Sequence, residues 1–131
     1  MFTLFLERTD RVLLARFAGT FTLDVIARFD RAVMLILGRE GPLRGIVDLS
    51  DVDGVDIPDE GFRKRAQQPP MAAGQERVFV AEKPSALAFA QTYAALHRDF
   101  GSIPPGIVST RSDACKLLGL TDPKFEPLEL P

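Results

Sequence analysis

The stretch that decides the fold is residues 45–60, GIVDLSDVDGVDIPDE. Its first five residues form a short and almost continuous apolar run, which is typical of an interior strand of a parallel sheet. A carboxylate-rich loop is predicted over residues 50–59, and Pro58 suits the first turn of a following helix. The stretch therefore predicts a strand, a loop and a helix in succession, which is the repeating unit of an α/β sheet.

The residues before this stretch predict a hairpin and a long helix. Residues 2–7 and 12–17 have the composition of strands, and the four polar residues between them are enough for a tight turn but not for a parallel crossover. We therefore expect an antiparallel pair. Thr22 is a good helix N-cap, and the apolar residues of 23–37 recur at three- and four-residue steps up to stop signals at Gly38 and then at Gly41-Pro42.

Three further helices and two further strands are predicted along the chain. They are, in order, a helix at about 58–68, a strand at 77–81, a helix from Pro84 to about 100, a strand at 107–109 and a helix at 111–118. The chain thus predicts an α/β domain of order ββαβαβαβα, with a mostly parallel five-stranded sheet that an antiparallel hairpin opens and four helices cover. We assign residues 1–120 to this domain, and residues 121–131, with three prolines, to an extended C-terminal tail.

Length, net charge and cysteine count limit which compartment and which partners we expect. The 131 residues suffice for one domain, and 16 basic against 18 acidic side chains leave a net charge of −2, which gives no attraction to nucleic acid. A single cysteine excludes an internal disulfide and fits a reducing compartment. The N-terminus lacks a signal-peptide pattern, and the longest apolar run is far below the roughly 20 residues of a membrane span. We therefore expect a cytoplasmic protein with no membrane span and no nucleic-acid partner.

Few residues of the sequence suggest catalysis. His97 is the single histidine and Cys115 the single cysteine, and the sequence offers no third group to orient a base beside either. Glycine-rich phosphate loops of the common spacings are absent from the sequence. The three consecutive bases at 63–65 are too few for a nucleic-acid footprint and are predicted to lie on a solvated helix face. We expect no catalytic residue, no cofactor and no metal ion.

The carboxylates of the acidic loop leave one enzymatic alternative open. Asp48, Asp51 and Asp53 would be the ligands of a metal-dependent hydrolase, because carboxylate oxygens suit hard cations such as Mg²⁺. Residues 51–55, DVDGV, also match the nucleophile motif of haloacid-dehalogenase-type phosphatases. Those enzymes carry the motif on their first strand, however, whereas a hairpin and a helix precede it here. The spacing does not fit a calcium-binding loop either, so the simpler interpretation is a solvated loop whose carboxylates cap the next helix.

Two apolar features predict binding. The helix at 23–37 carries more apolar residues than one face can bury, and its second face could join two copies of the chain as a homodimer. A small apolar-ligand or lipid carrier is the alternative, with a pocket between the first and third helices lined by Phe29, Val33, Phe89 and Tyr93. Ordinary core packing would use the same four side chains.

The predicted hairpin, the first helix and residues 45–61 together resemble the anti-sigma-factor antagonist (STAS) superfamily, in its small stand-alone, SpoIIAA-like bacterial branch. The likeness spans roughly residues 2–120 and implies a non-catalytic module that binds proteins. Some members of the family are switched by phosphorylation of a serine where the helix after the acidic loop begins. Ile57 and Pro58 stand there instead. Because neither has a hydroxyl group, the phosphorylation switch does not carry over.

The resemblance also implies a partner-binding surface. It places that surface on the acidic loop and the start of the next helix, at Ser50, Asp51, Asp53, Asp56, Ile57 and Asp59. The leading hypothesis is therefore a non-enzymatic, STAS-like regulatory module whose protein partner and pathway the sequence does not identify.

Overall fold

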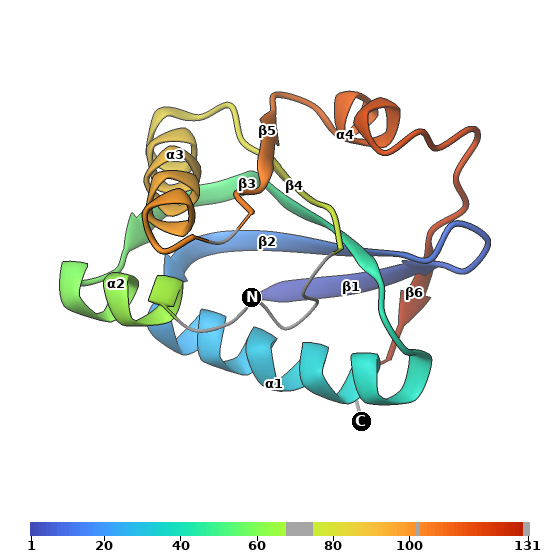
Figure 1. The fold of residues 1–131 in the computed structure, drawn as a ribbon, viewed down its shortest axis with the longest axis horizontal. Helices are drawn as coiled ribbons and strands as arrows, with labels where there is room; N and C mark the ends of the chain where they lie inside the picture. Colours follow the sequence, from blue (N-terminus) through green and yellow to red (C-terminus); the bar gives the residue numbers. More distant parts are fainter. Residues whose placement is uncertain (68–74, 102, 130–131) are drawn as a thin grey trace.

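The computed structural model describes residues 1–67, 75–101 and 103–129 (Figure 1). Within them the chain forms one six-stranded mixed sheet and four helices. The elements are, in chain order, β1 (Phe2–Glu7), β2 (Val12–Thr22), α1 (Leu23–Glu40), β3 (Arg44–Asp56), α2 (Asp59–Gln67), β4 (Arg77–Val80), α3 (Pro84–Asp99), β5 (Gly106–Val108), α4 (Arg111–Leu117) and β6 (Glu126–Leu128). The α/β class and the four helices agree with the prediction, whereas the predicted number of five strands is wrong. Among the described helices, none is both long and apolar enough to cross a membrane.

The sheet combines a parallel part with an antiparallel edge. Its strands lie in the order β5-β4-β3-β2-β1-β6. The four strands β2 to β5 are parallel, and β1 pairs antiparallel with β2 on one side and with β6 on the other. Every connection from β2 to β5 advances by one strand in the same direction. Right-handed crossovers therefore place α1, α2 and α3 on the same face of the sheet.

The two faces of the sheet carry separate apolar clusters. The larger cluster joins α1 and α3 to one face and includes Leu13, Ala15 and Phe79 of the strands. The smaller cluster joins α4 to the other face over Leu14 and Ile46. Neighbouring residues of β2 thus belong to different clusters, as the two-residue period of a strand requires. Since α1 and α3 cover the same face, the space between them lies over the middle strands.

The sixth strand comes from the segment predicted as an extended tail. β6 pairs with β1, and this short strand includes a proline, which is tolerated at a sheet edge. The side chain of Glu7, only 4% exposed, holds the segment before β6 in place through a hydrogen bond to Lys124. Its Oε2 accepts a hydrogen bond from the backbone N–H of Lys124 at 2.5 Å, while Oε1 accepts from the N–H groups of Thr9 and Asp10 in the hairpin turn at 2.7 and 3.3 Å. The bond from Lys124 contributes most to lowering the pKa of Glu7, against the opposing effect of burial.

β3 includes most of the segment predicted as the acidic loop, and that prediction is wrong over this part. β4 pairs only with Gly45–Asp48, whereas the far end of β3 pairs with β2 alone. Aspartate and glycine disfavour strands, but Asp51 and Asp53 alternate with Val52. The valine is 1% exposed, and both carboxylates face solvent. Burial of the inward side chain therefore outweighs the poor strand propensity of its neighbours.

The ends of α1 agree with the predicted cap and with the second of two predicted stop signals. Thr22 caps the helix as predicted, because its hydroxyl oxygen accepts a hydrogen bond from a backbone N–H of the first turn at 3.2 Å. Of the two predicted stop signals, Gly38 does not end the helix, which runs on to Glu40, whereas the second, at Gly41-Pro42, does. Gly41 ends it with a φ of 82°, a left-handed conformation that glycine adopts without strain, and its N–H donates to the carbonyl of Leu37 at 2.9 Å.

Replacement of Glu7 with alanine is expected to release the segment around Lys124 while the central strands stay in place. The exchange of the Lys124 amide hydrogen, followed by NMR, should become about tenfold or more faster, because the amide loses a charged acceptor. Acidification below the ordinary glutamate pKa of 4.5 should weaken the same contact in the wild-type chain, since the lowered pKa contributes stability only while the group is ionised. Glu126→Ala, an exposed change in β6, is the control. Unchanged exchange at Lys124 would contradict the role given to Glu7.

Candidate functional site

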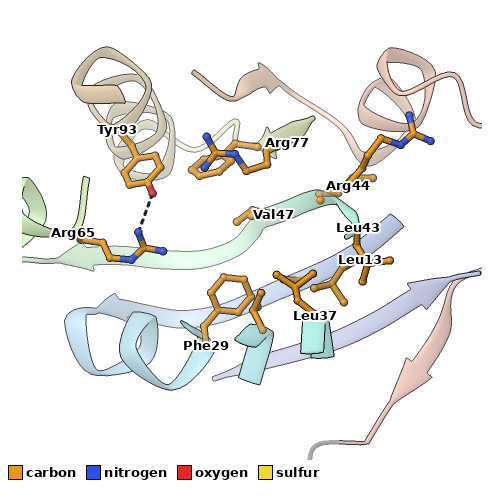
Figure 2. A pocket seen from close by; sticks show the side chains of 14 residues that line it. Leu13, Phe29, Leu37, Leu43, Arg44, Val47, Arg65, Arg77 and Tyr93 are labelled. Atoms are coloured by element: carbon orange, nitrogen blue, oxygen red, sulfur yellow. Dashed lines mark hydrogen bonds between the residues drawn. The ribbon is translucent and has the colours of Figure 1, made fainter. Parts of the chain in front are cut away.

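A pocket of about 120 Å³ lies between α1 and α3 on the sheet face that these helices cover (Figure 2). Its floor is formed by residues of β2, β3 and β4, including Leu13 and Val47. Phe29 and Leu37 of α1 line one side of it, and Tyr93 of α3 lies on the other. The lining residues of β3 are Arg44, Gly45, Ile46 and Val47, so the pocket lies over the first half of that strand, whereas α2 lies at its carboxyl end (Figure 1). Most of the lining is aliphatic or aromatic.

The structure brings together the four apolar side chains predicted for a pocket. Phe29, Val33 and Tyr93 line the 120 Å³ pocket. Phe89 lines an adjoining space of about 50 Å³, which Phe29 and Tyr93 also border. The same side chains pack against other aromatic rings, with 5.9 Å between the ring centres of Phe89 and Tyr93 and 5.1 Å between those of Phe29 and Phe17. They therefore serve both as core and as pocket wall.

Arg65 joins α1, α2 and α3 at one side of the pocket. Its guanidinium donates two hydrogen bonds of 2.8 Å to the Asp30 carboxylate, and Nη1 lies 3.5 Å from the Tyr93 hydroxyl (Figure 2). Burial is the largest single effect and opposes the charge on Arg65, but Asp30 and Tyr93 together outweigh it and raise the pKa of Arg65. α2 approaches α1 closely at Gly61, where a Cβ atom would stand 2.5 Å from Leu23. The prediction that Arg65 lies on a solvated helix face is therefore wrong.

Two more arginines line the pocket, and neither was singled out in the sequence. Arg77 of β4 donates to the carbonyl oxygen of Ile103 at 3.0 Å, and Arg44 of β3 donates to the carbonyls of Leu118 and Asp10 at 2.8 and 3.3 Å. Within the described residues, neither forms an ion pair with a carboxylate. In Figure 2 the guanidinium of Arg44 points away from the pocket, whereas Arg77 extends toward Tyr93. Each is the first residue of its strand, next to the apolar residues that follow it, and that position is the only sequence signal that could have found them.

His97 is fully buried behind the aromatic wall of the pocket. It is 0% exposed, its ring centre lies 4.4 Å from that of Tyr93, and neither of its nitrogens has a hydrogen-bond partner among the described residues. Burial lowers the pKa of His97, and the charges of Arg77 and Arg65 lower it further. The ring is therefore neutral near pH 7 and is a packing residue in this arrangement.

The acidic residues predicted to bind a partner form an exposed edge, but basic side chains face several of them. Asp51, Asp53, Asp56 and Asp59 are exposed, as is Ser50, while Ile57 is half-buried against the larger apolar cluster. The ion pairs of this edge, with their N–O distances, are Arg16–Asp51 at 3.1 Å, Lys83–Asp53 at 3.9 Å and Arg111–Asp48 at 3.4 Å. These bases come from distant elements, so the sequence run of carboxylates overstates the local negative charge.

The proposed ligands of a metal-dependent hydrolase do not converge. Asp48 is buried and accepts hydrogen bonds from the N–H and hydroxyl of Ser50 at 2.9 and 2.6 Å, whereas Asp51 and Asp53 face solvent. No three His, Cys, Asp or Glu side chains within residues 1–67, 75–101 and 103–129 are placed to hold a metal ion. The described geometry therefore gives this alternative no support.

Comparison with known proteins adds no family to these observations. The chain matches no family model, and a search of curated protein sequences found no significant match. The resemblance to the STAS superfamily therefore rests on residue pattern and element order, and enters below as a proposal.

The buried His97 should make the free energy of unfolding depend on pH between about 5.5 and 7.5. Histidine is the side chain whose ordinary pKa, 6.5, lies in this range. A lowered pKa means that the unfolded state binds the proton more readily, so stability is full above about pH 6.5 and falls as the pH drops below it. The loss is at most about 1.4 kcal/mol per pH unit for one group. Urea unfolding at pH 7.5 and 5.5 should show this loss in the wild-type chain and a flat profile in His97→Phe and His97→Leu. A wild-type chain equally stable at both pH values would rule out a buried neutral ring.

Proposed function

We propose that the chain is a non-enzymatic, STAS-like binding domain whose pocket between α1 and α3 takes up a small, largely apolar ligand. The observation that supports this function is the pocket of about 120 Å³, whose mostly apolar lining includes Tyr93 and three arginines. That combination is typical of small-molecule sites. An enclosed cavity of about 150 Å³ holds benzene, so the smaller volume of about 120 Å³ suits only a compact ligand or the end group of a longer one.

The placement of the reactive side chains supports a role without catalysis. His97 lies on α3, within the elements of the larger cluster, whereas Cys115 packs against the smaller cluster on the other face of the sheet. The two residues therefore cannot act as a nucleophile and its base. Burial raises the pKa of the Cys115 thiol, which reduces its nucleophilicity near pH 7. Together with the single cysteine, these features suit a binding protein of a reducing compartment, for which we propose the cytoplasm.

Toluene is a suitable first probe of the pocket. A neutral ligand that binds the folded chain should raise the midpoint of thermal unfolding, by an amount equivalent to about 1.4 kcal/mol at a tenfold excess over its dissociation constant. Val33→Phe should abolish the effect, because the larger side chain fills the space that toluene would occupy. Met34→Phe, its neighbour on the exposed side of α1, is the matched control and should bind like the wild type. Equal stabilisation of all three chains, or of none, would argue against this pocket as the site.

A second candidate function is binding of a protein, as the STAS resemblance implies. The observation that favours it is the outer side of α1, where Met34 is 64% and Leu35 is 58% exposed. Exposed apolar side chains that neighbour each other on a helix suit a protein contact, including contact with a second copy of the chain. The exposed carboxylates of Asp53, Asp56 and Asp59 form a separate surface at the carboxyl end of β3 and the start of α2, which is where the STAS resemblance would place a partner.

Static light scattering tests the homodimer form of this second candidate. We expect the wild-type chain to show the mass of a dimer and the double variant Met34→Asp, Leu35→Asp to show the mass of a monomer, because two buried charges per subunit would oppose association. Leu117→Asp, which changes an exposed leucine of α4, should leave the mass unchanged. A monomeric wild-type chain would exclude self-association through α1.

A further inference from the structure

The pocket has an unbalanced charge. Arg44, Arg65 and Arg77 line it, and the described lining residues include no carboxylate. Asp30 neutralises only Arg65, through the two bonds of 2.8 Å. Two guanidinium groups without an ion-pair partner among the described residues therefore belong to the wall of an apolar pocket. Both side chains are only half-buried, and an anion that enters the pocket meets charges that no carboxylate of the described lining compensates.

Arg77 is the arginine best placed to meet a ligand. Its guanidinium has five N–H donors, and the only hydrogen bond from it among the described residues uses Nη2, to the carbonyl of Ile103. Arg44 instead donates hydrogen bonds from two nitrogens to carbonyl oxygens, and its guanidinium points away from the pocket (Figure 2). Nε and Nη2 of Arg65 both donate to the carboxylate of Asp30. Arg77 thus keeps free donors on the pocket side that faces Tyr93.

The groups around Arg77 define where an anion would sit. Figure 2 shows Arg77 extending above Val47 toward Tyr93. The Tyr93 hydroxyl in turn points toward the guanidinium of Arg65. The charges of Arg77 and Arg65 also act on His97, which packs against the Tyr93 ring, so their positive field extends to the aromatic wall. On the opposite side the pocket is closed by apolar side chains of α1, among them Phe29 and Leu37. One side of the pocket is therefore cationic and the other apolar.

We propose that the pocket binds a small monocarboxylate, with its carboxylate on Arg77 and its compact apolar body against α1. The size of the pocket, about 120 Å³, limits that body to roughly a benzene ring or a short branched chain. A guanidinium matches a carboxylate in a planar, two-point hydrogen-bonded geometry. This inference rests on the proposed ligand-binding function and adds the chemical class of the ligand; it does not depend on the protein-partner alternative.

Benzoate and benzyl alcohol test the inference as a matched pair, because they share a ring and differ in charge. In calorimetric titrations at low salt the wild-type chain should bind benzoate about tenfold or more tightly than benzyl alcohol, as expected for a hydrogen-bonded charge. Arg77→Met should remove this preference, and Arg77→Lys should retain part of it. Arg63→Met, which removes an exposed arginine of the same charge on α2, should bind like the wild type.

The outcomes separate the failure of this inference from the failure of the proposed function. Equal affinity of the wild-type chain for both probes, with displacement of toluene by each, would overturn the carboxylate assignment and leave the apolar pocket standing. Binding of neither probe nor of toluene would overturn both. Benzoate affinity that persists in Arg77→Met and in Val33→Phe would place the anion elsewhere on the chain and also contradict the assignment. A titration of the wild-type chain at 1 M salt needs no variant, and should weaken benzoate but not benzyl alcohol.

Discussion

The parallel pairing of β2 with β3 is the interaction on which the rest of the structure depends. It extends from Val12 opposite Arg44 to Thr22 opposite Asp56, well beyond the reach of β4 on the other side of β3. The carboxyl ends of both strands therefore project together, and α1 and α2 begin at this common end (Figure 1). α2 begins beyond the reach of β4 and contacts the first half of α1, with Gly61 beside Leu23 and Arg65 paired with Asp30. The pocket lies over the first half of β3.

Charged side chains are arranged differently on the two faces of the sheet. On the face that carries α4, the carboxylates of β3 are matched by bases from other elements, in the pairs Arg111–Asp48, Arg16–Asp51 and Lys83–Asp53. Asp48 is buried, but the pairs of the exposed Asp51 and Asp53 contribute only about 0–1 kcal/mol each, so the far end of β3 is an ordinary solvated surface. On the opposite face, Arg77 lies beside aromatic and aliphatic side chains without such a match in the described chain. An anionic ligand would supply the missing partner, which is why this face is the better candidate for function.

The candidate site was predictable in its apolar half and not in its charged half. Phe29, Val33, Phe89 and Tyr93 follow helical periodicity, and the parallel topology puts their two helices on one face, so their meeting could be expected. The sequence did not show that Arg65, of the three consecutive basic residues 63–65, would be the one that becomes buried and paired, because all three carry the same charge. Its role depends on Asp30, which is 35 residues away and becomes a neighbour only when α2 packs on α1 at Gly61.

The sequence by itself determined the class of the fold, the four helices, the opening hairpin and the cap at Thr22, because each depends on periodicity or on hydrogen bonds within a few residues. Tertiary structure decided the features that need a distant partner. The acidic segment became strand because β2 continues beside it and buries Val52, and the tail became a sixth strand because Glu7 and the open edge of β1 supply its hydrogen bonds. It also decided which arginines face the pocket, since burial and ion pairing depend on neighbours that local sequence does not specify.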